Sequence, residues 1–150
     1  MSLVEVIVGA AIATLILSGL IAAYQLYFKT ALANLRHVQA IFLAEESAEA
    51  LRFLRDGSWS NLSSLTAGAT YYLVFQSGNW QIITNNIFVD EIFERKLVLS
   101  NINRDVNDDI APTGTLDPNT KKATITISWS NGLATTSKPL ELYLTNLFND

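Results

Sequence analysis

The chain of 150 residues contains no cysteine and a single histidine, His37. Without cysteine it has no disulfide, no thiol nucleophile and no cysteine-ligated metal. One histidine excludes a zinc site built from several histidines, and no glycine pattern typical of phosphate or dinucleotide binding occurs. The acid pairs Glu45–Glu46 and Glu91–Glu94 are expected to serve structure rather than acid–base chemistry. We therefore expect neither an enzyme nor a cofactor.

Basic residues are also scarce. Ten lysines and arginines face fourteen acidic residues, which gives a formal net charge of −4. A nucleic-acid binder needs a basic face, so we expect no direct nucleic-acid partner. The tryptophans Trp59, Trp80 and Trp129 have no cluster of basic neighbours, and we interpret them as core or loop anchors rather than a base-stacking platform.

The apolar residues are concentrated at the start of the chain. Residues 1–28 contain 21 apolar side chains and a single charge, Glu5. The uncharged run from Val6 to Phe28 would span about 35 Å as a helix, enough for a bilayer core of about 30 Å. A secretory signal peptide would begin with positive charge and have a shorter apolar core. A plain membrane anchor explains the run but not the carboxylate of Glu5, which is costly there unless it is paired.

The opening Met1-Ser2-Leu3-Val4-Glu5-Val6 resembles the mature N-terminus of type IV pilins and the related pseudopilins. That family has a Thr or Ser second, two aliphatic residues and then Glu; Met1 stands where Phe is commoner, and the proline found midway along many of these helices is missing. The resemblance implies a leader removed by a prepilin peptidase and N-methylation of Met1. It also implies that residues 1–28 form both the membrane span and the core of a filament.

The partner of Glu5 is restricted by the sequence. The nearest lysine or arginine is Lys29, about 36 Å further along a helix. The cation available at the level of Glu5 is therefore the α-amino group of Met1, and the two groups could pair within one chain or between chains. The resemblance favours pairing between subunits, so Met1 and Glu5 are the predicted assembly charge pair.

The helix is expected to continue through residues 29–56 as an amphipathic half, because no Pro or Gly interrupts it before Gly57. The spacing of the apolar residues in this half separates two faces of the helix. The lower stripe is Phe28, Leu32, Leu35, Gln39 and Phe42, and the upper stripe is Ala40, Leu43, Ala44, Ser47, Leu51 and Leu54. We expect the upper stripe to pack on the chain's own sheet and the lower stripe to form an inter-subunit face. One broad stripe against a single core remains the alternative.

Residues 57–150 are expected to form a globular β domain, with a loop over 57–68 and a sheet over 69–146. Alternating apolar and polar residues predict about five antiparallel strands. The predicted strands cover residues 71–76, 80–84, 92–100, 121–130 and 138–146, with a polar loop over 101–120. The last two should pair and bury Ile125, Ile127, Trp129, Leu140, Leu142 and Leu144. The predicted fold class is α+β, a long N-terminal helix packed on an antiparallel sheet, which is also the order in the pilin fold.

Two further segments are candidate sites. Asn103, Asp105, Asn107 and Asp109 alternate, which is a weak calcium pattern; a turn-rich loop is the favoured interpretation because the Gly and closing Glu of an EF-hand are absent. Asn61-Leu62-Ser63 is a glycosylation acceptor triplet in the expected outward loop.

The sequence thus predicts a pilin, a homopolymer that enters an extracellular type IV pilus-like fimbrium from the cytoplasmic membrane. Its partners would be identical subunits, the prepilin peptidase and the pilus assembly machinery. A minor pilin or pseudopilin that primes such a machine is one alternative, and a membrane-anchored binding domain that never polymerises is the other. Adhesion, motility and DNA uptake are downstream uses that the sequence does not separate.

Overall fold

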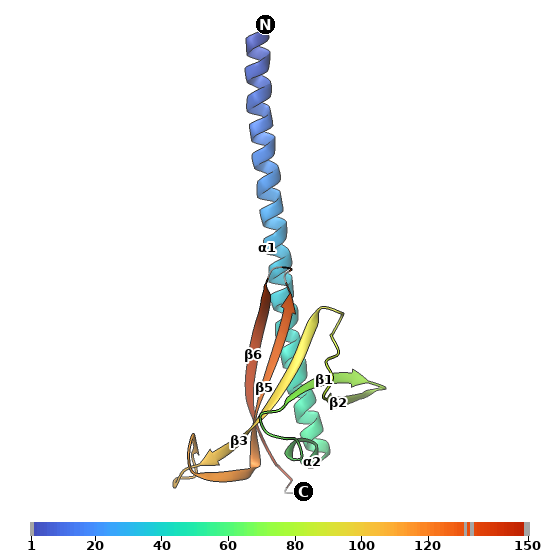
Figure 1. The fold of residues 1–150 in the computed structure, drawn as a ribbon, viewed down its shortest axis with the longest axis vertical. Helices are drawn as coiled ribbons and strands as arrows, with labels where there is room; N and C mark the ends of the chain where they lie inside the picture. Colours follow the sequence, from blue (N-terminus) through green and yellow to red (C-terminus); the bar gives the residue numbers. More distant parts are fainter. Residues whose placement is uncertain (1, 131, 133, 149–150) are drawn as a thin grey trace. The chain divides into compact units, whose positions relative to one another are not determined.

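A computed structural model of the chain describes residues 2–130, 132 and 134–148. The chain divides into two compact units, Met1–Gln39 and Ala40–Asp150, and helix α1 contributes to both. Figure 1 follows the elements along the chain. They are α1 (Leu3–Gly57), α2 (Ser60–Ser63), β1 (Thr70–Gln76), β2 (Asn79–Ile83), β3 (Phe93–Arg104), β4 (Ile110–Ala111), β5 (Thr115–Ser130) and β6 (Thr135–Thr145).

The first unit contains the part of α1 from Leu3 to Gln39. Its residues favour a helix because it is rich in Ala and Leu and contains no proline. Every described side chain from Ser2 to Leu32 is exposed. The unit therefore has no core of its own, and its fold rests on the hydrogen bonds of the helix backbone.

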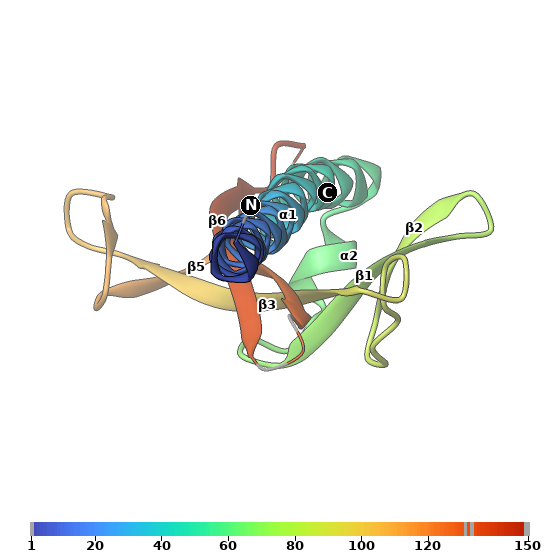
Figure 2. The same cartoon turned by 90° about the horizontal axis from the view of Figure 1, so that it is seen from above.

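The second unit has a single core between α1 and the sheet. From Ala40 onward, α1 lies on one face of the sheet (Figure 2). The buried residues on the helix side of this core are Ala40, Ala44, Ser47, Ala48 and Leu51, and the half-buried Leu43 and Leu54 pack against it. Small side chains let a helix backbone approach its neighbours closely, and the strands supply the large side chains, among them Phe93, Leu97, Ile125 and Trp129. The predicted packing of the upper stripe is confirmed.

All strand pairs are antiparallel, in the order β2-β1-β3-β5-β6, and β4 pairs with β3. The first two strands form a hairpin, with positive φ at Ser77 (54°) and Gly78 (79°) as its two-residue turn requires. β5 and β6 pair as expected, with Ile125 opposite Leu140. Ile125 and Ile127 are fully buried, so the predicted register is confirmed.

The expected polar loop over 101–120 is wrong in most of its length. β3 continues to Arg104 and β5 begins at Thr115, with an irregularity in the register after Asn101. A cross-strand ion pair accounts for part of this extension, because Arg104 Nε lies 2.7 Å from Asp117 Oδ2. Gly114 allows the chain to turn from β4 into β5. Its φ is 142°, and a Cβ there would lie 2.1 Å from the carbonyl oxygen of Arg104.

Two smaller expectations also need correction. The predicted loop over 57–68 contains the short helix α2, which buries Leu62 in the core. The last strand begins at Thr135 rather than at residue 138, so Pro139 lies within it. Proline is tolerated there because β6 is an edge strand of the sheet.

Candidate functional site

The N-terminal end of α1 contains a pair of reciprocal hydrogen bonds. The backbone N–H of Glu5 donates to Ser2 Oγ (3.3 Å), and the backbone N–H of Ser2 donates to Glu5 Oε2 (3.4 Å). This is a capping box, which satisfies two donors that a helix start leaves open. The sequence analysis missed it, although Ser and Glu three residues apart are its usual signal. Met1, the other member of the predicted charge pair, lies outside the described residues.

The surface from Leu3 to Phe28 is apolar and fully exposed. Its serine and threonine hydroxyls are satisfied within the helix: Thr14 Oγ1 donates to the carbonyl of Ala11 (2.8 Å) and Ser18 Oγ to that of Leu15 (2.8 Å). A surface in contact with hydrocarbon has to satisfy its polar groups internally in this way. By length and composition α1 is able to cross a membrane.

The two stripes of the amphipathic half differ in exposure. The apolar members of the lower stripe are exposed, Phe28 by 53%, Leu32 by 42%, Leu35 by 54% and Phe42 by 65%. Gln39 is also exposed. The upper stripe is covered by the chain's own sheet. One broad stripe against a single core stays the alternative, and the contact of the lower stripe with neighbouring subunits stays a prediction.

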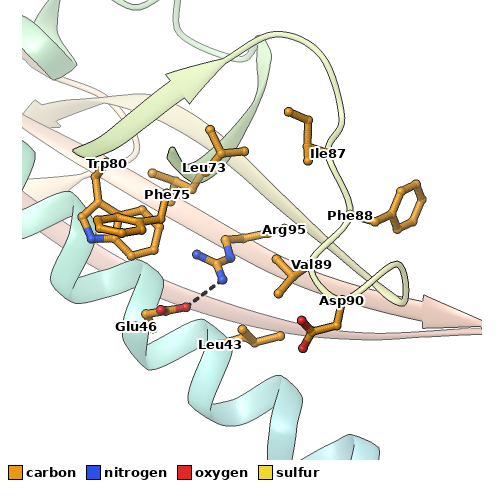
Figure 3. Close-up of a pocket in the computed structure, with 11 residues that line it drawn as sticks. Leu43, Glu46, Leu73, Phe75, Trp80, Ile87, Phe88, Val89, Asp90 and Arg95 are labelled. Carbon is orange, nitrogen blue, oxygen red and sulfur yellow. Dashed lines mark hydrogen bonds and ion pairs between the residues drawn. The ribbon is translucent and has the colours of Figure 1, made fainter. Parts of the chain in front are cut away.

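A groove lies between the second half of α1, the β1–β2 hairpin and the segment between β2 and β3. Its first hollow has a volume of about 430 Å³. The apolar side chains that line this hollow include Leu43, Leu73, Phe75, Trp80, Ile87 and Phe88. Figure 3 shows Phe75 and Trp80 on one side of Arg95, with Val89 and Asp90 on the other.

A second hollow of about 610 Å³ continues the first along α1. It shares Glu46, Phe75 and Trp80 with the first and adds Glu49 and Phe53. We call the two hollows together the hairpin groove. Its size falls in the range of protein binding sites, and its walls expose large apolar groups, of which Phe53 and Phe75 are more than half exposed.

A buried cation lies at the base of the hairpin groove. Arg95 is 4% exposed, its Nη2 lies 2.7 Å from Glu46 Oε2, and its guanidinium carbon lies 5.2 Å from the centre of the Trp80 ring. Among the residues that the structure describes, Nε of Arg95 has no hydrogen-bond partner. Loss of solvent lowers the pKa of Arg95, and the charge of Glu46 opposes that shift. Arg95 thereby joins α1 to β3 and β2.

The rim of the hairpin groove is acidic. Asp90 lies on this rim, and Asp90 and its neighbour Glu91, which lines neither hollow, both have positive φ (51° and 58°), a conformation that non-glycine residues rarely adopt. Within the described part of the chain, neither carboxylate forms an ion pair. Glu46 is paired with Arg95 and Glu49 with Arg52, so the rim as a whole remains negative.

Of the candidate calcium residues, Asn103 lies in β3, and Asp105, Asn107 and Asp109 lie on the turn that joins β3 to β4. Asp105 Oδ1 accepts hydrogen bonds from the backbone N–H of Asn107 (2.8 Å) and of Asp109 (3.1 Å). Asn103 Nδ2 donates to the carbonyl of Pro112 (3.4 Å). These contacts favour the turn interpretation, since they use the Asp105 carboxylate to hold the backbone. No group of three His, Asp or Glu able to hold a metal occurs in the part of the chain that was described.

Asn61 lies in α2 rather than in an outward loop. Its Nδ2, the atom that a glycan would occupy, donates to the carbonyl oxygen of Leu54 (2.8 Å). That carbonyl belongs to the last turn of α1 and also accepts a hydrogen bond from the backbone N–H of Ser58 (3.3 Å). The side chain therefore has a structural use that glycosylation would disturb.

Comparisons with family models, with curated proteins and with solved structures gave no match. The hairpin groove and the buried Arg95 were not predicted from the sequence. One signal was present: Phe93, Arg95, Leu97 and Leu99 alternate, which places the arginine on the core face of its strand.

Proposed function

We propose that this chain is a pilin, the structural subunit of an extracellular type IV pilus-like filament that assembles from the membrane through the first half of α1. The observation that carries the proposal is the exposed apolar surface from Leu3 to Phe28, on a chain whose second unit has a complete core of its own. Such a surface needs a cover from outside the chain. Membrane lipid would cover it before assembly, and the helices of identical subunits would cover it afterwards.

The opening residues support the same proposal. Ser2, Leu3, Val4 and Glu5 fit the start of a processed pilin. A prepilin peptidase would release the α-amino group of Met1, and this amine would pair with Glu5 of a neighbouring subunit as the assembly machinery adds each copy. A minor pilin or pseudopilin would use the same contacts at the start of a filament.

One observation favours a second candidate, a membrane-anchored domain that never polymerises. The capping box gives the Glu5 carboxylate a local partner, the backbone N–H of Ser2. A carboxylate that caps its own helix does not require an amine from another chain. Under this alternative the first half of α1 remains in the membrane and the second unit acts alone.

Electron microscopy of sheared cell-surface material, with mass spectrometry of the same fraction, tests the proposal. We expect filaments composed of this chain, with a methylated Met1 at the mature N-terminus. A location confined to filament tips selects the minor subunit. Membrane fractions rich in the chain, from cells that make no filaments of it, select the anchored domain and contradict the proposal.

A further inference from the structure

Two exposed surfaces of this chain have opposite charge. Between Val6 and Ala44 the sequence contains no acidic residue, and its lysine and arginine are Lys29 and Arg36. These two lie seven residues apart, so they fall on the same flank of the lower stripe. Lys29 is exposed, whereas Arg36 is half-buried and already has a partner. The segment from Phe28 to Phe42 is therefore an amphipathic helix with an exposed apolar face and one exposed lysine on its flank.

The hairpin groove has the complementary character. Its walls are apolar, with Phe53, Phe75, Ile87 and Phe88 exposed, and its rim carries Asp90 without an ion pair. Arg95 attracts Asp90 as well as Glu46, but its one positive charge faces their two negative charges, so one negative charge remains. A helix that brings apolar side chains together with positive charge matches both features.

We propose that the hairpin groove of one copy receives the segment Phe28–Phe42 of a second copy. Recognition of an amphipathic helix by an apolar groove uses anchors spaced by three and four residues, and the lower stripe has that spacing. Leu32, Leu35 and Phe42 would enter the hollows beside Phe75, and Lys29 would approach the acidic rim. The inference rests on the proposed filament and deepens it by naming the contact surface.

The proposed contact joins two different surfaces of the chain. Each copy offers its helix segment to one neighbour and its groove to another, so the contact is heterologous. Heterologous contacts that do not close into a ring continue as an open helical filament. The contact therefore gives the second unit a direct part in polymerisation, in addition to the bundling of the apolar helices.

Disulfide cross-linking tests this contact, because the native chain contains no cysteine. The full-length double variant Leu35→Cys/Phe75→Cys places one thiol on the lower stripe and one in the groove. After mild oxidation of filaments and of detergent-solubilised membranes, we expect a ladder of dimers, trimers and longer species. Each single variant can form dimers at most, since one thiol makes one bond. The matched control Leu35→Cys/Ile110→Cys uses an exposed apolar residue of β4 and should give no ladder.

Absence of a ladder from both preparations, or an equal ladder from the Ile110 control, overturns the contact. Failure of the proposed function has a different signature, the lack of filaments in the cysteine-free parent. In that case the ladder in solubilised membranes still decides whether the groove receives the helix.

A charge reversal in the same double variant tests the choice of occupant. Lys29→Glu should lower the ladder yield about two- to fivefold, the range of a partly exposed ion pair. Lys138→Glu, at an exposed lysine of β6, is the matched control and should leave the yield unchanged. Equal yields for the two reversals would contradict the charge match from which the occupant was chosen.

Discussion

The two halves of α1 have the same secondary structure and opposite surroundings. From Leu3 to Phe28 its large apolar side chains are exposed, whereas from Ala40 to Leu51 small side chains lie buried against the sheet. A helix satisfies its own backbone, so it can form wherever its side chains find a cover. The chain supplies that cover for the second half through its strands. The side chains of the first half have to be covered by lipid or by other copies of the chain.

The largest expected effect concerns Glu5, where a charged contact between copies and a local helix cap compete as explanations. Glu5→Ala removes both, and we expect a chain that inserts in the membrane and is processed but forms few filaments. Loss of one partner from a buried ion pair costs about 3–5 kcal/mol, because the other charge is left alone. Filament yield by electron microscopy measures the effect, with membrane content as the control.

Glu5→Gln separates the two explanations. Glutamine can replace glutamate in a capping box, so this variant keeps the cap and loses the charge. We expect Glu5→Gln to be nearly as defective in assembly as Glu5→Ala. Normal filament yield from the glutamine variant would show that the cap is the role of Glu5.

Leucines in the two stripes provide the next comparison. Leu51 is fully buried, so Leu51→Ala should leave a cavity and lower the free energy of unfolding by about 2–5 kcal/mol. Leu35 is exposed, so Leu35→Ala should leave that free energy unchanged and weaken filament packing instead. Denaturant titration of the full chain in detergent, followed by tryptophan fluorescence, compares them. An equal loss of unfolding free energy for both variants would favour one shared core for the two stripes.

A smaller loss is expected at the ion pair beneath the hairpin groove. Glu46→Gln leaves the buried Arg95 without its carboxylate, and a charged group deprived of its partner costs about 1–3 kcal/mol. Arg95→Met removes the buried charge itself and keeps an apolar side chain of similar length, so it should cost less. The same titration in detergent ranks the two variants. A greater loss from Arg95→Met would assign the stability to contacts of the arginine other than Glu46.

The smallest effect is a pH dependence at the pair of Arg104 and Asp117. Burial alone would raise the pKa of Asp117, but hydrogen bonds from Arg104, Thr120 and the Asn119 N–H hold it below its ordinary value. A lowered folded-state pKa stabilises the fold above the unfolded-state value, about 3.9 for aspartate. The contribution is lost as pH falls through the folded-state pKa. Asp117→Asn should therefore be less stable than the parent at pH 7 and approach it below about pH 4. A stability difference that stays constant with pH would contradict this assignment.

Much of the fold was predictable because its signals are local. Alternation in residues 121–130 predicted that Ile125 and Ile127 face the core, and both are fully buried. The polar residues of 101–120 predicted a loop, whereas much of this segment belongs to strands β3 and β5. Their extended conformation depends on contacts between strands, such as Arg104 with Asp117, which lie 13 residues apart.

The sequence by itself determined the helix, the separation of its two stripes and the inward faces of the strands. These depend on backbone propensity and on the periods of helix and strand, which neighbouring residues fix among themselves. The tertiary structure alone decided the hairpin groove and the burial of Arg95. Both depend on how far the β1–β2 hairpin lies from α1 and on where Glu46 meets β3, and no local pattern sets such a distance between segments that pair across the core.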